Sequence, residues 1–140
     1  MRRRAFRLLR VPLLLGGAWL YGRAPSAALL ADRARRAHAD RAERFGALQA
    51  RLAALPEGEA REAAAARVDA LLRETKRTAV RGWDVLLIPP GAPRPDAAGW
   101  LRAGSERIVE PGDPPQLRGA YEIWVAPRGL LARAVHAVSG

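Results

Sequence analysis

The order of apolar and polar positions separates the start of the chain from the rest. Residues 1–31 begin with arginines, continue with an uninterrupted apolar run over residues 11–22, and end in small residues. This order is typical of a secretory signal, and the run is shorter than the roughly 20 residues that a spanning helix needs. An aromatic pair at the end of the run and weak cleavage sites also fit an uncleaved anchor. We therefore expect residues 1–31 to be a signal peptide or a signal-anchor helix.

The residues expected to carry targeting and membrane insertion are Arg2, Arg3, Arg4, Arg7, Arg10, Leu13, Leu14, Leu15, Trp19 and Tyr21. Among them, the stretch RRAF at residues 3–6 resembles the core of a twin-arginine export signal. Arg2 and Arg7 stand where that signal has a hydroxyl and an apolar residue. The location favoured is the inner membrane of a bacterial envelope, with the C-terminal part in the periplasm. The mitochondrial inner membrane and an ordinary buried helix over residues 6–31 rank below it, because the apolar run is more continuous than a presequence needs.

The pattern in residues 32–81 predicts a helical stalk. Alanine and arginine dominate its first part, which contains no β-branched residue before position 56, and such sequences favour helix. Apolar side chains then recur at spacings of three, four and three, which is a heptad seam suited to a partner helix. The seam consists of Phe45, Leu48, Leu52 and Leu55. Continued backwards, it meets Arg41, His38, Ala34 and Ala31, so we expect only about two heptads of it to be effective.

A break at residues 56–58 is expected to divide the stalk. The sequence PEG at this point precedes a second helical pattern that runs to about residue 80, with acids in its first turns and bases in its last, as the helix dipole favours. Two helices with one apolar stripe each predict an antiparallel hairpin. A single kinked coiled-coil helix is the alternative, because proline is tolerated in a first helical turn.

The composition changes again after residue 81, and residues 82–140 are expected to form a small strand-containing module. Its tryptophans are expected to supply much of its core. The proline-rich residues 89–95 are expected to be a stiff connector from a strand to a helix, with a docking segment as the alternative. The elements expected in β-α-β-β-α order are strands at 83–88, 107–110 and 121–125, a short helix over 96–103 between the first two, and a closing helix over 129–138. The whole chain is therefore expected to have an α+β fold.

The charge of the chain points to targeting more than to nucleic acid. The net charge is +10, but residues 1–31 contribute +6 of it and contain no acid, which leaves the remainder at +4. No basic stripe interleaved with aromatics is present, so the sequence does not favour a nucleic-acid interface. The absence of cysteine excludes disulfides and thiolate sites.

Catalytic and metal-binding patterns are also missing from the sequence. His38 is expected on an exposed helix, and His136 lies among apolar residues near the C-terminus. Ser105, Asp113 and His136 can be written as a triad, but no strand-turn-helix context surrounds the serine. The glycine spacing of a phosphate-binding loop is absent. We therefore expect no catalytic, cofactor or metal site and identify no small-molecule substrate.

These expectations combine into a non-enzymatic envelope protein, either membrane-anchored or exported, that acts as a structural or assembly component. Its architecture resembles that of bitopic components of secretion, pilus or phage lysis machinery. The expected partners are the membrane, through residues 1–31, and a protein or a second copy of the chain, through the helices. The alternative is a basic protein associated with nucleic acid or ribonucleoprotein, with the N-terminal arginines as a phosphate-binding arm.

Overall fold

A computed structural model describes residues 22–96 and 98–139 of the chain. All of the expected targeting residues, from Arg2 to Tyr21, lie outside the described part. Within that part, no helix combines the length and apolar character that crossing a membrane requires.

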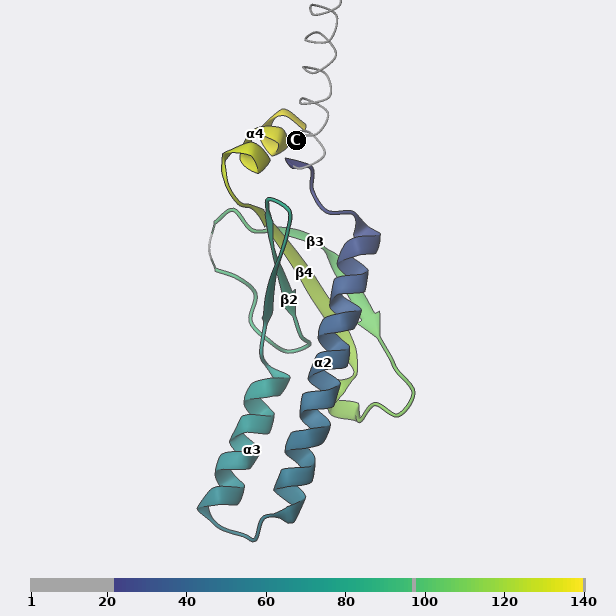
Figure 1. Cartoon of the computed structure of the whole chain (residues 1–140), viewed down its shortest axis with the longest axis vertical. Helices are drawn as coiled ribbons and strands as arrows, with labels where there is room; N and C mark the ends of the chain where they lie inside the picture. The colour runs from purple at the N-terminus through teal and green to yellow at the C-terminus, as the bar shows by residue number, and fades with distance from the viewer. Residues whose placement is uncertain (1–21, 97, 140) are drawn as a thin grey trace, which may run out of the picture.

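Two antiparallel helices form the hairpin that the sequence predicts (Figure 1). Helix α2 spans Ala27–Ala54, and helix α3 spans Glu59–Leu72. Ser26 begins α2, because its Oγ accepts a hydrogen bond of 3.2 Å from the backbone N–H of Leu29. Gly58 precedes α3 with φ of 147°, a conformation that favours glycine. The hairpin is thus confirmed over the single kinked helix.

The prediction that the second helix runs to about residue 80 is wrong. Helix α3 ends at Leu72, and strand β1 follows at Lys76–Val80. The stalk therefore does not extend to residue 81. Strand β1 pairs antiparallel with strand β2, Trp83–Ile88, in a register that places Val80 opposite Trp83. The backbone groups of β1 find their partners across this hairpin, and that pairing outweighs the weak helical pattern of the segment.

Four strands form one antiparallel sheet in the order β1-β2-β4-β3. Strand β3 spans Leu101–Ile108 and strand β4 spans Gly119–Pro127, with the short 3-10 helix η1, Pro115–Leu117, between them. Helix α4, Leu130–Ser139, closes the chain. The α+β class, the strands at 83–88 and 121–125 and the closing helix are confirmed.

The short helix expected over residues 96–103 is not found in the described part of that range, because Leu101 begins strand β3 instead. The third strand, expected at 107–110, therefore starts earlier and ends earlier than predicted, at Ile108. Strand β3 pairs with β4 along its length, with a register shift between Arg102 and Gly104. The pairing with β4 satisfies the backbone of this segment better than an isolated helical turn would.

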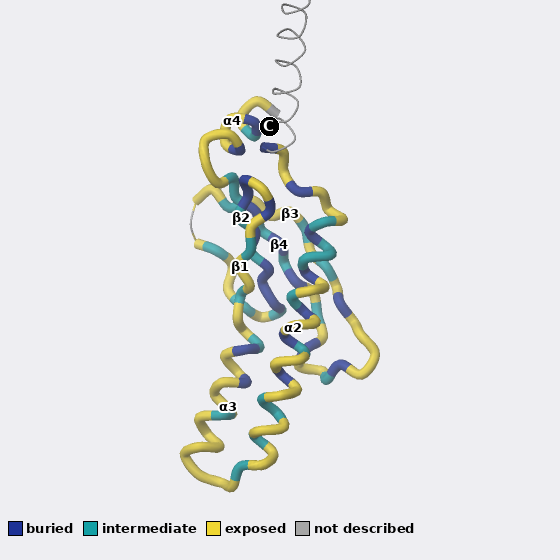
Figure 2. Tube along the Cα trace, viewed as in Figure 1, coloured by how far each residue is buried: buried dark blue, intermediate teal, exposed yellow. Residues whose placement is uncertain are grey.

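Helix α2 covers one face of the sheet, and the core lies between them (Figure 2). Alternate residues of the two central strands face α2, among them Val85, Ile123 and Val125. Leu30 and Ala34 on α2 pack against this face. Burying each large aliphatic side chain contributes about 1.5–3 kcal/mol. Among the tryptophans, Trp83 is fully buried, whereas the other two in residues 82–140 are half-buried, so the tryptophans supply less of the core than expected.

The proline-rich residues 89–95 connect strand β2 to strand β3, not to a helix as expected. Arg94 fastens this connector to the sheet by donating hydrogen bonds of 3.1 and 3.0 Å to the two carboxylate oxygens of Glu122. These bonds lower the pKa of Glu122. The paired contact fixes the connector to β4 and indicates a structural role for this stretch.

Candidate functional site

A buried polar cluster lies where helix α2 passes from the sheet to helix α3. The buried residues of α2 are Leu30, Ala34, His38, Arg41 and Phe45, at spacings of four, four, three and four. The heptad seam therefore does continue backwards, with polar side chains in its middle. The expectation that His38 lies on an exposed helix is wrong, because its exposed fraction is 0%.

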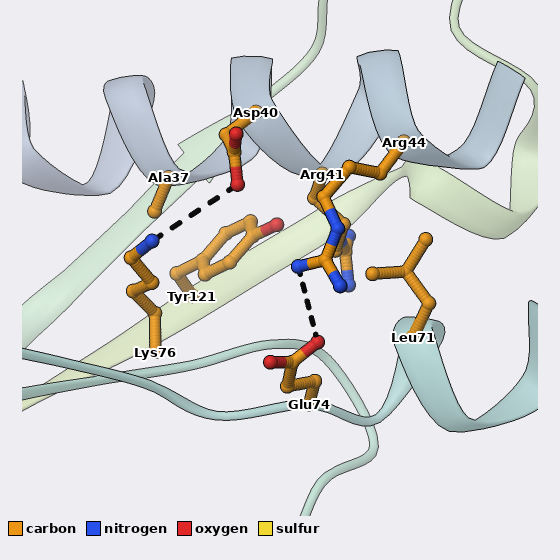
Figure 3. Close-up of a pocket in the computed structure, with 8 residues that line it drawn as sticks. All are labelled: Ala37, Asp40, Arg41, Arg44, Leu71, Glu74, Lys76 and Tyr121. Atoms are coloured by element: carbon orange, nitrogen blue, oxygen red, sulfur yellow. Dashed lines mark hydrogen bonds and ion pairs between the residues drawn. The ribbon is translucent and has the colours of Figure 1, made fainter. Parts of the chain in front are cut away.

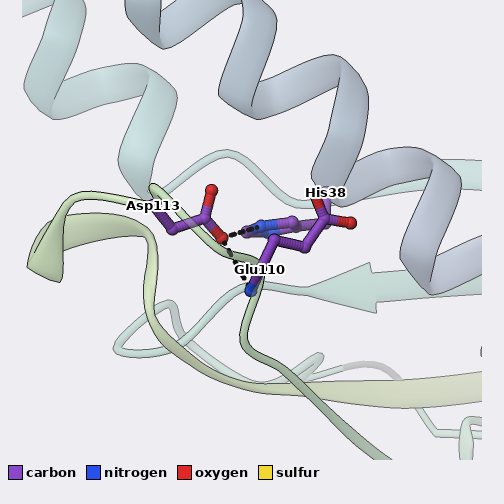
Figure 4. Close-up of side chains that lie close together, drawn as sticks. All are labelled: His38, Glu110 and Asp113. Atoms are coloured by element: carbon purple, nitrogen blue, oxygen red, sulfur yellow. Dashed lines mark hydrogen bonds and ion pairs between the residues drawn. The ribbon is translucent and has the colours of Figure 1, made fainter.

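His38 joins two other elements of the fold (Figure 4). Its Nε2 lies 2.7 Å from Oδ2 of Asp113, in the loop before η1, and its Nδ1 lies 3.3 Å from the hydroxyl of Tyr121 on β4. An ionised carboxylate only accepts hydrogen bonds, so Nε2 is assigned the proton and donates. In neutral His38, Nδ1 then accepts from the Tyr121 hydroxyl. The resulting chain runs from Tyr121 through His38 to Asp113.

Arg41 completes the cluster one turn further along α2 (Figure 3). Its guanidinium carbon lies 5.0 Å from the centre of the Tyr121 ring, and its Nη1 donates a hydrogen bond of 3.0 Å to the carbonyl oxygen of Leu72. Leu72 is the last residue of α3, so Arg41 binds one of the carbonyls left unpaired at that helix end. Among the described residues, Nε of Arg41 has no hydrogen-bond partner.

Burial and charge shift two pKa values in this cluster. Desolvation raises the pKa of the Tyr121 hydroxyl to about 12, and the cation of Arg41 opposes the shift. Desolvation likewise lowers the pKa of Arg41, while Tyr121 and Asp113 oppose that change. Both shifts follow from placing polar groups in a medium that disfavours their charged forms.

The side of the cluster next to Arg41 and Tyr121 is closely packed. A tyrosine, histidine and aspartate chain has the groups of an acid-base relay. However, the pocket beside Arg41 and Tyr121 has a volume of only about 20 Å³, which is room for about one water molecule. A substrate could not reach His38 through this pocket in the conformation described. The cluster instead links α2, the loop before η1 and β4.

The structure does not bring the Ser105, Asp113 and His136 combination together. Asp113 is bound to His38, while His136 lies on α4 and packs edge-on against Trp83 with ring centres 5.5 Å apart. Helix α4 follows the far end of β4, at the opposite end of the sheet from the Asp113 loop (Figure 1). These positions leave no basis for the triad.

His38, Glu110 and Asp113 form a group whose donor atoms lie within 4.8 Å of one another. No local sequence pattern indicates this group, because His38 and Asp113 are distant in the chain. A cation bound to Nε2 of His38 would have to displace the hydrogen bond between His38 and Asp113. It would also face the nearby cation of Arg41. The three groups therefore fit a hydrogen-bonded network better than a metal centre.

Next to the cluster, a surface groove of about 600 Å³ runs between α2 and residues 111–117. Phe45 and Gly46 contribute its wall on α2, and Leu117 contributes to the opposite side. Phe45 itself is buried with Val68, Leu71 and Leu117. Phe45, the first residue of the predicted seam, therefore packs within the domain and not against a partner helix.

The remaining residues of the predicted seam lie closer to the tip of the hairpin. Leu48, Leu52 and Leu55 are each half-buried, and Leu48 packs against the Phe45 cluster. These three leucines are thus partly accessible on the hairpin.

Comparison with protein-family models, with curated proteins and with solved structures finds no match to this chain.

Proposed function

We propose that this protein is a non-enzymatic, membrane-anchored component of a bacterial envelope assembly that presents its helical hairpin to a protein partner. The proposal is carried by the way the end of the apolar run is attached to the fold. Nε1 of Trp83 donates a hydrogen bond of 2.9 Å to the carbonyl oxygen of Gly22, the last residue of that run. Gly22 is buried against Val135 so closely that a Cβ atom there would lie 2.6 Å from the valine side chain.

This attachment supports an anchor because it fixes the domain relative to the chain that enters it. An exported domain on a flexible linker would not need a buried junction at Gly22. Trp83 is itself part of the sheet core, so the junction is rigid. An anchor joined in this way would hold the domain in one orientation to the membrane.

The tip of the hairpin points away from that junction (Figure 1). Helix α2 has 28 residues, which corresponds to a length of about 42 Å. Between Phe45 and Val68, all of which the structure describes, no residue is buried (Figure 2). Helix α3 has only 14 residues, and an isolated helix of that length is marginal without packing. The tip of the hairpin is therefore the part of the domain best suited to contact a partner or a second copy.

Membrane anchoring can be tested by extracting membranes from cells that express the tagged chain, first with high salt and then with detergent. An anchored protein is expected to resist salt and to dissolve in detergent. Release by salt alone would contradict the anchor and favour the nucleic-acid alternative, because electrostatic contacts are screened by salt. The intact mass of the extracted chain shows whether residues before Gly22 have been removed.

Partner binding by the hairpin can be tested with a photo-crosslinking residue at Ala63, an exposed position on α3. The matched control carries the same residue at Ala103, an exposed position on β3. We expect adducts from position 63 and none from position 103 in intact cells. An adduct of twice the chain mass indicates self-association. Equal labelling at both positions, or none at position 63, would contradict a role for the hairpin.

A further inference from the structure

Helix α4 is apolar on two sides. Ala132 and Val135 face the rest of the domain and are buried. On the other side, Leu130 is 86% exposed, Val138 is 79% exposed and Leu131 is 41% exposed. At 100° per residue, these three side chains and the exposed Ala134 and Ala137 fall on one continuous stripe. A contiguous exposed apolar patch of this kind is typical of a contact with a protein or a membrane.

The exposed stripe lies beside the point where the apolar run enters the domain. Val135 packs against Gly22, and the carbonyl oxygen of Leu131 lies 3.1 Å from where a Cβ of Gly22 would be. Residues 11–22 are the longest apolar run in the sequence. If that run is inserted in a bilayer, helix α4 is the part of the described domain held next to the lipid surface.

Arginines surround the same end of the domain. Arg23 and Arg81 line one surface groove, and Nη2 of Arg81 donates a hydrogen bond of 3.2 Å to the carbonyl oxygen of Arg23. Arg128 lies nearby, with its guanidinium 3.7 Å from the carboxylate of Asp84. Arg133 lies on α4, at the edge of the apolar stripe, and is exposed. Cations at the rim of an apolar stripe complement anionic lipid headgroups.

We infer that helix α4 lies in the surface of an anionic phospholipid bilayer, with Leu130, Leu131 and Val138 among the acyl chains and the arginines at the headgroups. The inference rests on the proposed anchor, since the anchor brings α4 to the membrane. A second copy of the chain fits the stripe less well. In an antiparallel pairing of two α4 helices, the two Arg133 side chains would lie on the same side of the contact and repel each other.

The chain contains no cysteine, so single-cysteine variants can be labelled at one position. The full chain is reconstituted in vesicles of phosphatidylcholine and phosphatidylglycerol, with an environment-sensitive fluorophore at Leu130→Cys or Val138→Cys. The control is Ala63→Cys, on the hairpin. We expect a blue shift at positions 130 and 138 and the loss of most of their emission when the lipids carry nitroxide quenchers. The control emission is expected to stay unchanged. Leu130 and Val138 are so exposed that neither substitution should disturb folding.

The outcomes separate the anchor from the role of α4. If the chain floats with vesicles but positions 130 and 138 behave like position 63, the inference for α4 is overturned and the anchor stands. If the full chain does not float with vesicles, both are overturned. If the Leu130→Cys variant forms disulfide-linked dimers and its label is not quenched by the nitroxide lipids, the stripe contacts a second copy instead of the bilayer. Weaker quenching at position 130 in the Arg133→Gln variant, or in vesicles without phosphatidylglycerol, would support a contribution of the arginines to lipid binding. Unchanged quenching in both cases would contradict that contribution.

Discussion

Nε2 of His38 donates a hydrogen bond of 2.7 Å to Oδ2 of Asp113, although 75 residues separate the two in the sequence. The side chain of His38 is fully buried and that of Asp113 is 9% exposed. A contact of this kind closes a long loop and fixes helix α2 to the loop before η1. Its loss leaves a buried polar group without a partner, which costs more than the bond itself contributes.

The substitution Asp113→Ala is expected to lower the free energy of unfolding by about 2–3 kcal/mol, because His38 then stays buried without its acceptor. Combining it with His38→Ala should show a coupling of about 1–3 kcal/mol. The measurement is urea unfolding of the detergent-solubilised chain followed by circular dichroism. Asp40→Ala is the matched control, because Asp40 is exposed and its carboxylate makes only a long ion pair, 4.0 Å from Nζ of Lys76. This substitution should change the free energy of unfolding by less than about 0.5 kcal/mol. Similar effects of Asp113→Ala and the control would contradict a structural role for the cluster.

Tyr121 is expected to titrate with a pKa of about 12 in the folded chain, against about 10 in the unfolded chain. Because the folded value is raised, the stability that depends on this proton is complete below pH 10 and is lost as the pH rises towards about 12. Tyrosinate absorbance in a Tyr21→Phe variant reports Tyr121 alone, since the chain has two tyrosines. The same titration in denaturant is the control. A folded-state pKa near 10 would show that the hydroxyl is not desolvated.

Two glycine substitutions are expected to act in opposite directions. In Gly22→Ala the new Cβ would lie 2.6 and 2.9 Å from side-chain atoms of Val135, so we expect a loss of about 1–3 kcal/mol. In Gly46→Ala the new Cβ meets nothing within 4 Å, and alanine in a helix interior gains about 0.5–1 kcal/mol over glycine. Thermal unfolding of the two variants side by side measures both. A harmless Gly22→Ala would mean that the junction with Val135 is loose.

We expect some residues of the predicted seam to contribute mainly to stability and others mainly to partner binding. Phe45→Ala should cost about 3–4 kcal/mol, because Phe45 is buried with Val68, Leu71 and Leu117. Leu52→Ala should cost about 1 kcal/mol, since Leu52 is only partly buried. It should nevertheless reduce crosslinking from position 63 if the hairpin meets a partner. Urea unfolding and crosslinking yield are measured on both variants. Unchanged crosslinking in Leu52→Ala would place the partner contact elsewhere.

The heptad spacing marked the buried stripe of helix α2 over a longer stretch than we expected from the polar residues within it. The pattern continued through Arg41 and His38, which we expected to end the effective seam because both are polar. Both are buried, because their partners Asp113 and Tyr121 come from distant parts of the chain. A signal was present in the spacing, but only the residues brought opposite by folding make polar side chains tolerable there.

The conformation of some strands follows from their own sequence, whereas that of others depends on pairing with a distant segment. The apolar run at 83–88 and the alternation at 121–125 were sufficient to predict strands β2 and β4, since each carries its own buried face. Strands β1 and β3 are the edges of the sheet, and most of their residues are exposed. Their sequences therefore carry little hydrophobic pattern, which indicated only the end of β3, and the pairing with a central strand decides their conformation.

Local propensity and periodicity within single segments were enough to predict the two central strands, the closing helix and the location of the excess positive charge. For residues 32–81 they predicted helix but left a hairpin and a single kinked helix open. Folding brings His38 to Asp113, buries Gly22 against Val135 and leaves an apolar stripe of helix α4 in solvent. These features depend on which distant side chains occupy the same space, and no local pattern encodes that.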